Sequence, residues 1–373
     1  MKYCSTRGQE RNLTFEEVLF SGYAKDGGLY MPEFFPNISN EELEQWSKYS
    51  YPELVFAVAR KFIDEEEISC AVLNDIIISC LKRFRIPEVV RIEKLKGGLN
   101  IIELFHGTTL AFKDLALSVV GGLIDHYLSK RNKHIIILIG TSGDTGSAAI
   151  EGVRGRKGID IVVLLPDGRC SVIQELQMTT VIEDNVHIYK VEGTSDDLDE
   201  PIKQCFGDQK LVSKHNLISI NSINWGRIML QVAHFFFSYY QLCSDVGAPV
   251  EIVVPTGAAG NITDSMVVSD TAITTTMKTV YAENKYILCP HTATAVYYHH
   301  QRNSDATRGF IATASPAKFP EAVAKADIYP ITDGVEHLQD LPTKFLWMRK
   351  GEDWHSILCA KIENITKNID IKV

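Results

Sequence analysis

One lysine in this sequence, Lys113, stands between apolar residues at the start of a helix-like run. From Leu115 to Tyr127, leucine, valine, isoleucine and tyrosine recur at the spacing of a largely buried helix. Asp114 adds the negative charge that suits a helix N-terminus. The amine of Lys113 is therefore either the end of a surface side chain whose stem covers apolar residues, or a shielded nucleophile kept for chemistry.

Two glycine-rich turns, GTSGDTG at 140–146 and PTGAAGN at 255–261, each follow an apolar strand-like segment and precede a helix-like one. Backbone N–H groups at such a turn, with the helix dipole behind them, bind anions. Neither turn has the spacing of a nucleotide P-loop or of a dinucleotide fingerprint. Each alone is explained by the tight turn that glycine permits. Two of them at the strand ends where parallel sheets bind ligands favour a binding site.

These features together favour a site for pyridoxal 5'-phosphate. A shielded lysine forms a Schiff base with this cofactor, an anion-binding turn holds its ester phosphate, and a hydroxyl-rich turn contacts its ring oxygen or a substrate carboxylate. The eight cysteines are scattered, without a C-x-x-C or any other paired spacing, so we expect reduced thiols and no metal site.

The composition is that of a globular cytoplasmic protein. The chain has 373 residues, more than one hydrophobic core usually serves, so two domains are expected. A formal net charge of −9 argues against nucleic acid or an anionic membrane as the main partner. There is no apolar run long enough to span a membrane, and the N-terminus has no signal-peptide pattern, so we expect a cytoplasmic location.

Short apolar segments alternate with helix-like segments after about residue 99, whereas residues 1–95 look mostly helical. The strand candidates are 99–105, 133–140, 158–166, 185–193, 251–257 and 285–290. This alternation predicts an α/β fold with parallel sheets and right-handed crossovers. The last two strand candidates are joined by one helical span, about 262–283, which is long enough for a parallel crossover that keeps both in one sheet.

Eight short motifs are spread along almost the whole chain: STRG (5–8), SGYAKDGGLYMPE (21–33), HGTTLAFKD (106–114), GTSGDTGSAA (140–149), NSINWGR (221–227), PTGAAGN (255–261), CPHTATAV (289–296) and TASPAKFPEAV (313–323). In this order they resemble the motifs of the threonine synthases, which are fold-type II pyridoxal-phosphate enzymes. The resemblance implies a two-domain, tryptophan synthase β-like architecture with mostly parallel sheets covered by helices. It divides the chain into a mostly helical region at 1–98, a smaller βα domain at 99–215, and the remainder of the larger cofactor-phosphate domain at 216–373.

The same resemblance assigns roles to residues of this chain. It makes Lys113 the Schiff-base lysine and implies no metal. The cofactor phosphate would be held by Gly257, Ala258, Ala259, Gly260 and Asn261. The pyridine nitrogen would face Thr313, whose neutral hydroxyl favours elimination over transamination. The ring oxygen and the substrate carboxylate would face Thr141, Ser142, Asp144 and Thr145, and the substrate's phosphate end would face Asn221, Ser222, Asn224 and Arg227. For each of these polar residues the alternative is loop capping.

Four departures from the family pattern affect the site. HGTT replaces HGPT and should loosen the loop before the lysine. In SINWGR, Gly226 stands in place of a hydroxyl, and in TASPAKF, Ser315 stands in place of a histidine. After Thr263, about 100 residues of the family pattern are absent, within the size of a small domain. The larger domain is therefore expected to be truncated, as in a spliced form.

An animal branch of the family shares the AAG form of the phosphate loop, and it implies a phospho-lyase. Its substrates would be O-phosphohomoserine and O-phosphothreonine, and its products 2-oxobutanoate, ammonia and phosphate. The alternative is a catalytically impaired form that acts, if at all, as a non-enzymatic binding protein. The expected partner is a small phosphorylated amino acid, with a homo-oligomer possible and neither nucleic acid nor membrane involved.

Overall fold

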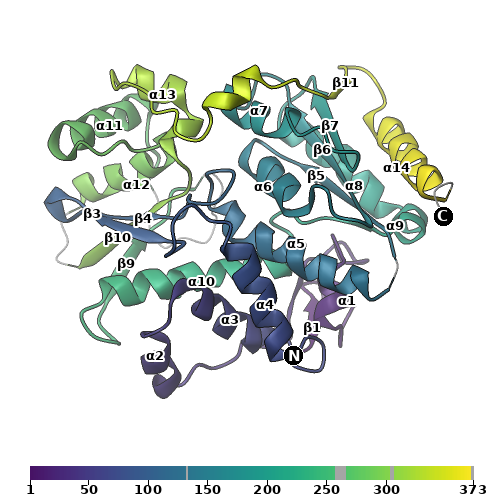
Figure 1. Cartoon of the computed structure of the whole chain (residues 1–373), viewed down its shortest axis with the longest axis horizontal. Helices are drawn as coiled ribbons and strands as arrows, with labels where there is room; N and C mark the ends of the chain where they lie inside the picture. The colour runs from purple at the N-terminus through teal and green to yellow at the C-terminus, as the bar shows by residue number, and fades with distance from the viewer. Residues whose placement is uncertain (132, 257–265, 303–305, 371–373) are drawn as a thin grey trace.

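Two β-sheets covered by helices make up most of the described part of the chain, and a small two-stranded sheet lies near the N-terminus (Figure 1). The computed structural model describes residues 1–131, 133–256, 266–302 and 306–370. Its mostly parallel strand pairs and covering helices confirm the predicted α/β fold class. Within the described residues, every helix is too short or too polar to cross a membrane.

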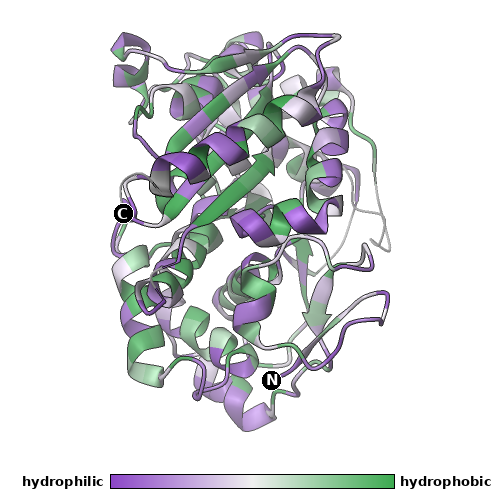
Figure 2. Ribbon diagram, turned by 90° about the vertical axis from the view of Figure 1, so that its right-hand side faces the viewer, coloured by the Kyte–Doolittle hydropathy of each residue, from purple (hydrophilic) through white to green (hydrophobic). Residues whose placement is uncertain are grey.

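The larger sheet has five parallel strands. In sheet order they are β11 (Leu346–Met348), β7 (Val186–Val191), β6 (Ile159–Pro166), β5 (Ile135–Gly140) and β8 (Leu217–Ile218). The apolar residues of its inner strands β5 to β7 are buried on both faces, whereas Leu346 and Trp347 of the edge strand β11 are exposed. Successive side chains of a strand point to opposite faces. In β5, Ile135 and Ile137 pack with α5 and α6, whereas Ile136 and Leu138 pack with α8, α9 and α14. Figure 2 shows the apolar character of the covered strands.

Helices on the two faces of this sheet belong to consecutive strand–helix units. One face carries α5 (Lys113–Ser129), α6 (Asp144–Val153) and α7 (Val172–Thr179). The other face carries η2 (Asp196–Leu198), α8 (Asp199–Gly207), α9 (Gln209–His215) and the C-terminal α14 (Trp354–Asp370). Because helices cover both faces of the sheet, its strands are continuous apolar runs in the sequence. This pattern is why they could be predicted.

The second sheet has four strands and joins distant parts of the chain. Its strands, in order, are β3 (Arg91–Lys94), β4 (Asn100–Glu103), β10 (Thr307–Ala312) and β9 (Val250–Val253), with β3 antiparallel and the others parallel. One face packs on α10 (Trp225–Leu242), and the other on α11 (Asp270–Asn284) and α12 (Pro290–Gln301). The short elements nearby are η1 (Lys96–Gly98), η3 (Pro316–Lys318), α13 (Pro320–Lys325) and η4 (Glu336–Asp340).

The N-terminal region combines short helices with the small two-stranded sheet, and its extent as a separate region stays a prediction. It contains β1 (Tyr3–Ser5), α1 (Phe15–Leu19), β2 (Tyr30–Pro32), α2 (Asn40–Trp46), α3 (Tyr51–Phe62) and α4 (Cys70–Leu81). Helix α3 starts with a proline in its first turn, where the missing N–H costs nothing. Its Tyr51 ring lies edge-on to Phe237 of α10, with 5.6 Å between centroids, so α3 packs directly against the long buried helix.

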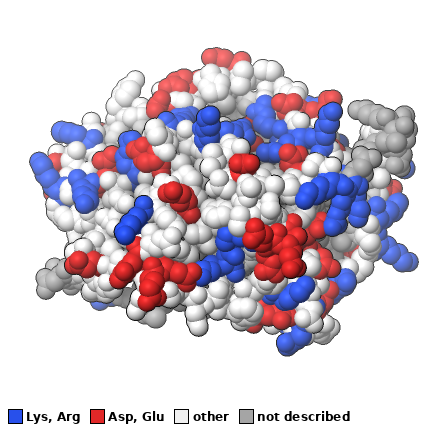
Figure 3. All heavy atoms as spheres, turned by 60° about the horizontal axis from the view of Figure 1, so that its bottom comes forward, with Lys and Arg blue, Asp and Glu red and all other residues white. Residues whose placement is uncertain are grey.

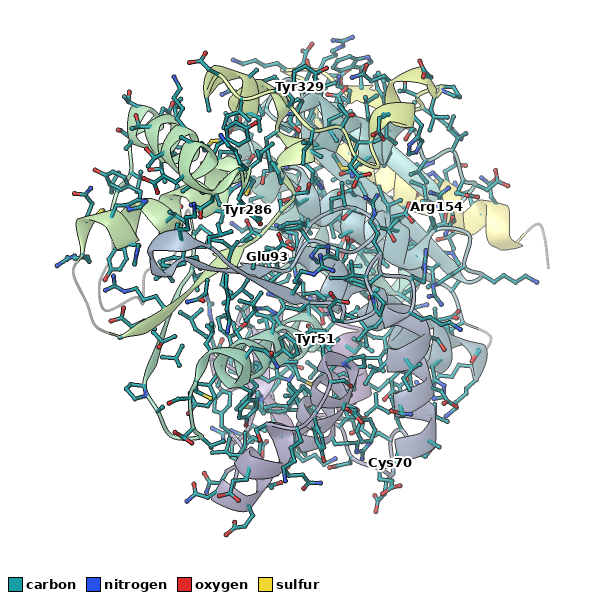
Figure 4. The ribbon with its side chains drawn as sticks, turned by 60° about the vertical axis from the view of Figure 1, so that its left-hand side comes forward. Tyr51, Cys70, Glu93, Arg154, Tyr286 and Tyr329 are labelled. Carbon is teal, nitrogen blue, oxygen red and sulfur yellow. The ribbon has the colours of Figure 1, made fainter. Side chains whose placement is uncertain are left out.

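The predicted strand at 285–290 is wrong. Lys285 ends α11 in the left-handed conformation, and Cys289 caps α12, which begins at Pro290. Between them, the hydroxyl of Tyr286 donates to Glu103 of β4, and Figure 4 places Tyr286 close to Glu93 of β3. The apolar run is therefore a buried connection between two helices. The partner of β9 is β10 instead.

Strands from both sides of residue 215 share each sheet. β4 pairs with β10, and β8 and β11 join the sheet that contains β5 to β7. The domain boundaries at residues 98 and 215 stay predictions. What the strand pairing does establish is that the C-terminal third of the chain contributes strands to both of the larger sheets.

Candidate active site

The N-terminal ends of α5 and α6 open onto one cavity of about 510 Å³. It is lined by Lys113, Ser142, Asp144, Thr145, Arg169, Ser171, Gln174, Pro290, His291 and Phe319. Four of the predicted site residues therefore meet here: Lys113, Ser142, Asp144 and Thr145. Both helices follow strands of parallel pairs, so their N-termini converge where parallel sheets bind ligands.

The amine of Lys113 is shielded rather than spread over the surface. Its side chain is 19% exposed, and Nζ lies 3.7 Å from Oδ2 of Asp144 and 4.4 Å from the centre of the Phe112 ring. Burial lowers the pKa of Lys113 to about 8; Asp144 opposes this shift, while the charges of Arg227 and Lys318 add to it. A neutral amine is therefore accessible near physiological pH. The geometry favours the shielded nucleophile of the two readings of this lysine.

Asp144 is held ionised by a lysine that the sequence reasoning missed. Lys318 is 0% exposed, and its Nζ lies 2.9 Å from Oδ1 of Asp144. Gln174 donates to the same oxygen at 2.8 Å. Burial alone would raise the pKa of Asp144, but Lys318 and Lys113 outweigh it and hold that pKa well below its usual range. Asp144 thus stays negative between two lysines.

Thr109 fixes the loop that leads into Lys113. Its N–H and hydroxyl donate to the two carboxylate oxygens of Asp114 at 2.8 and 2.7 Å. Its carbonyl accepts from Lys318 at 2.7 Å and from Gln177 at 3.1 Å. Asp114 is therefore a buried anchor, and burial raises the pKa of its carboxyl group to about 6. These bonds hold the loop despite the departure from HGPT.

Gly107 in the same loop permits the close approach of Asp114. A Cβ at this position would lie 2.4 Å from the Cβ of Asp114, a distance that real contacts never show. A glycine is thus required here by packing. In the sequence, only the motif HGTTLAFKD indicated that this loop belongs to the site. The neighbouring residues do not indicate that the side chain of Asp114 is buried.

Several of the predicted polar residues use their side chains in hydrogen bonds to backbone groups. The Thr141 hydroxyl accepts from the N–H groups of Gly143 and Gly146 at 3.0 Å. Asn224 caps α10 and is almost fully buried, with its amide bonded to carbonyls of neighbouring loops. Asn221 donates to the Gly140 carbonyl at 3.1 Å. For these three side chains the structure favours loop capping, while Ser222 is exposed.

Arg227 is a predicted site residue whose positively charged guanidinium is buried. Its side chain is 4% exposed, and Nε donates to Gln231 at 3.1 Å, but one terminal nitrogen has no hydrogen-bond partner among the described residues. Burial lowers the pKa of this guanidinium to about 10, and its charge lowers the pKa of Lys113. A buried cation without a carboxylate is costly, so an anion is its natural ligand.

Two departures from the family pattern have structural explanations. A Cβ on Gly226 would lie 2.9 Å from a methyl group of Leu19, so the glycine lets α10 pack closely against α1. Ser315 accepts from the N–H of Ala317 at 3.2 Å and caps η3, which carries Lys318. Its own N–H donates to Leu110 at 3.0 Å. Ser315 therefore helps to place Lys318 beside Asp144.

Two predicted contacts are only partly described. The Thr313 carbonyl accepts from the N–H of Phe112 at 2.8 Å, which places Thr313 beside the Lys113 backbone. The predicted phosphate loop, Gly257, Ala258, Ala259, Gly260 and Asn261, lies outside the described residues. The roles of both stay predictions.

His291 and Cys289 are further residues at the cavity that the sequence reasoning quoted within a motif without giving them a role. The Cys289 thiol accepts from the N–H of Thr292 at 3.4 Å and caps α12. The Cys289 sulfur accepts a hydrogen bond from the protonated His291 ring and so raises the pKa of His291, whose ring faces Phe319. The signal available beforehand was a histidine directly after a helix-starting proline.

Comparison with protein families and curated proteins gives consistent matches. The family model described as "Threonine synthase N terminus" matches residues 2–81. Threonine synthase-like 2 from Xenopus laevis is 41% identical, with 98% of this chain and 99% of the relative covered. The Homo sapiens protein of the same name is also 41% identical, covering 98% of both chains.

The alignment with the Xenopus relative also bears on the predicted gap. It spans 469 positions, 96 more than the 373 residues of this chain. At least 96 positions of the relative thus have no counterpart in this chain, and their place after Thr263 stays a prediction. Among solved structures, pyridoxal-phosphate-bound threonine synthase from Brucella melitensis is similar, with 27% identity, 98% of this chain and 99% of that chain covered, and a TM-score of 0.84.

Proposed function

This chain belongs to the threonine synthase family, and from that premise we propose that it binds pyridoxal 5'-phosphate at Lys113 and eliminates phosphate from a small phosphorylated amino acid. The proposed substrates are O-phosphothreonine and O-phosphohomoserine. The proposed products are 2-oxobutanoate, ammonia and phosphate. The observation that carries the proposal is the shielded amine of Lys113, with its lowered pKa, at the cavity that also contains Asp144.

The described residues fit this cofactor. The cavity of about 510 Å³ lies in the usual range for a small-molecule site. Its wall offers an amine for covalent attachment and the hydroxyls of Ser142 and Thr145 for polar contacts. The buried guanidinium of Arg227, whose charge lowers the pKa of Lys113, offers a donor for an anionic group. When bound, the cofactor supplies an electron sink for negative charge at the substrate α-carbon.

Lys113 is the residue placed to move protons. With a pKa of about 8, Nζ can accept a proton from the α-carbon and return it, as a general base near neutral pH requires. For O-phosphothreonine, one proton leaves the α-carbon and phosphate leaves the β-carbon. For O-phosphohomoserine, a second proton must leave the β-carbon so that phosphate can leave the γ-carbon, and a proton is then returned to the γ-carbon to give the same enamine. Hydrolysis of the released enamine gives the keto acid and ammonia.

Arg227 is proposed to hold the phosphate end of the substrate. It is buried, it makes no ion pair with a carboxylate in the part of the chain that the structure describes, and its charge lowers the pKa of Lys113. A guanidinium binds phosphate oxygens through paired N–H groups. The surface charge agrees with a small anionic substrate rather than a nucleic acid, because acidic and basic side chains are interspersed on the face in Figure 3 and the net charge is −9.

The test is cofactor fixation followed by product analysis. The purified chain is incubated with pyridoxal 5'-phosphate, reduced with borohydride and mapped by mass spectrometry, and the label is expected on Lys113. Phosphate and 2-oxobutanoate are then measured from both substrates, for the native chain and for Arg227→Met. We expect a raised KM in the variant with the label retained. A label on another lysine, or equal KM values, would contradict the assignment.

One observation favours the second candidate, a binding protein without activity. Beyond the edge strand β9, Val254 is 38% and Val267 98% exposed, on either side of the predicted gap. Apolar side chains exposed beside a sheet edge mark a contact surface or an unstable region. A chain that folds cooperatively, takes no label and releases no phosphate would support this second function.

A further inference from the structure

Three side chains with metal-binding atoms meet on the far side of the larger sheet. Cys205 lies on α8, and His355 and Cys359 lie one turn apart on α14. One potential ligand atom from each lies within 4.8 Å of the other two. The Cys359 sulfur is 3.4 Å from Nε2 of His355. Figure 1 shows α14, in yellow, running beside α8 and α9.

We propose that Cys205, His355 and Cys359 form a binding site for one Zn²⁺ ion, which joins the C-terminal helix to α8. Thiolate and imidazole are the ligands that zinc prefers, and three protein ligands plus water complete its tetrahedron. With Zn–S near 2.3 Å and Zn–N near 2.0 Å, two ligand atoms of a tetrahedral site lie about 3.6–3.8 Å apart. The cluster therefore needs shifts of no more than about 1 Å to hold the ion.

The surroundings suit a metal site. Cys205 is fully buried, so its bonds to the ion would be protected, while His355 and Cys359 are half-buried. His355 also lines an open groove together with Gln204 and Trp354, which gives the ion and a fourth, water ligand a path from solvent. Two thiolates would neutralise the double charge of the ion, which removes the cost of burying it.

The site was invisible in the sequence because its parts are 150 residues apart. His355 and Cys359 have the i, i+4 spacing that puts two ligands on one helix face. Cys205 joins them only because α14 packs on α8 through the apolar residues Leu358 and Ile362. Scattered cysteines alone predicted no metal site.

Zinc at this position would stabilise the fold near the cavity. The α8 side chain of Ile202 packs directly over Gly140, where β5 ends and the loop to Asp144 begins. An ion bound by both α14 and α8 would therefore stabilise the helices that cover β5. Because the unfolded chain offers no preformed site, binding should raise the melting temperature.

The experiment uses the full chain, reduced and stripped of metal. Zn²⁺ is titrated in competition with a chromophoric chelator, and Co²⁺ is used as a spectroscopic substitute whose charge-transfer absorption reports thiolate ligation. We expect one ion per chain, a rise in melting temperature and reversal by a chelator. Cys359→Ser and His355→Gln should each weaken Zn²⁺ binding more than about 100-fold, the upper end of what loss of an outer-shell partner costs.

Cys243→Ser is the matched control, because Cys243 is also half-buried at a helix end but lies outside the cluster. It should bind Zn²⁺ like the native chain. The proposal is overturned if the native chain binds no stoichiometric ion, or if Cys359→Ser binds as tightly as the control. It is also overturned if thiol counting and peptide mapping find a disulfide between Cys205 and Cys359 in protein purified without reductant.

Discussion

The ammonium nitrogen of Lys318 lies 2.9 Å from a carboxylate oxygen of Asp144, and Lys113 approaches the other oxygen of the same group. With Arg227 nearby, three cations share a buried neighbourhood with two carboxylates, Asp144 and Asp114. Asp114 is the one whose pKa is raised to about 6, so it is only partly charged when the medium is mildly acidic. The positive surplus is what a phosphorylated ligand would neutralise.

Replacing the proposed Schiff-base lysine should remove activity without unfolding the protein. In Lys113→Ala we expect no borohydride-fixed cofactor and a loss of phosphate release of at least about 100-fold, because no other group is assigned the proton transfer. The melting temperature should change little, since Asp144 keeps its closer partners Lys318 and Gln174. Lys130→Ala, at the exposed far end of the same helix, should retain label and turnover. Turnover equal to that of the native chain would show that the chemistry lies elsewhere.

The amine of Lys113 should titrate near pH 8. Its pKa lies about 2.5 units below the ordinary value of 10.5, mainly because of burial. Neutral amine is the reactive form, so modification of the cofactor-free protein should increase with pH and be half-maximal near pH 8. At pH 7 its neutral fraction should exceed that of an exposed lysine by about 300-fold. Competitive labelling with peptide mapping measures this, and an inflection above pH 10 would be inconsistent with a shielded amine.

Lys318→Met should destabilise the fold strongly. The change removes one buried donor from Asp144 and one from the Thr109 carbonyl, and breaking a buried ion pair costs about 3–5 kcal/mol. Urea unfolding measures the loss. Lys325→Met on the neighbouring α13 is the control, because Lys325 is exposed and should change the free energy of unfolding by less than about 0.5 kcal/mol. Equal effects of the two substitutions would show that the Lys318–Asp144 ion pair does not stabilise the fold.

Thr109→Val tests the loop before Lys113. It keeps the shape of the side chain but removes the hydroxyl that donates to Asp114 at 2.7 Å. Leaving one buried carboxylate oxygen without this donor costs about 1–3 kcal/mol. Thr108→Val, one residue away and exposed, should be nearly neutral. Chemical denaturation distinguishes them, and a neutral Thr109→Val would mean that the loop is held by the backbone bond alone.

Strand β9 should exchange its amide hydrogens faster than β5. Among the described strands, β9 pairs only with β10 and its side chains are at least partly exposed, whereas β5 lies between β6 and β8 and is buried. Local opening free energies range from near zero to the global value, and we expect about 100-fold faster exchange for 251–253 than for 136–139. Residues 309–311 of β10, central in the same sheet as β9, are the internal control. Equal protection of the amides of 251–253 and 136–139 from exchange in a monomer would contradict the prediction that the sheet is less stable at its β9 edge.

Local pattern was enough for much of this protein. The sequence predicted the strands β5, β6 and β7 from their continuous apolar runs and helix α5 from the helical spacing of apolar residues after Lys113. Each pattern indicates which faces of the element are buried. The motifs and their order determined the family. The lysine that begins α5 was therefore identifiable before any contact was known.

Tertiary packing alone decided the rest. The run at 285–290 is as apolar as a strand, yet it connects two helices because β10 takes the place beside β9. Lys318 is ordinary in sequence and becomes a buried partner of Asp144 because η3 folds against α7 and the loop before Lys113. Cys205 meets His355 and Cys359 only where α14 covers α8. Burial and charge proximity are set by segments remote in sequence, so no local pattern of residues encodes them.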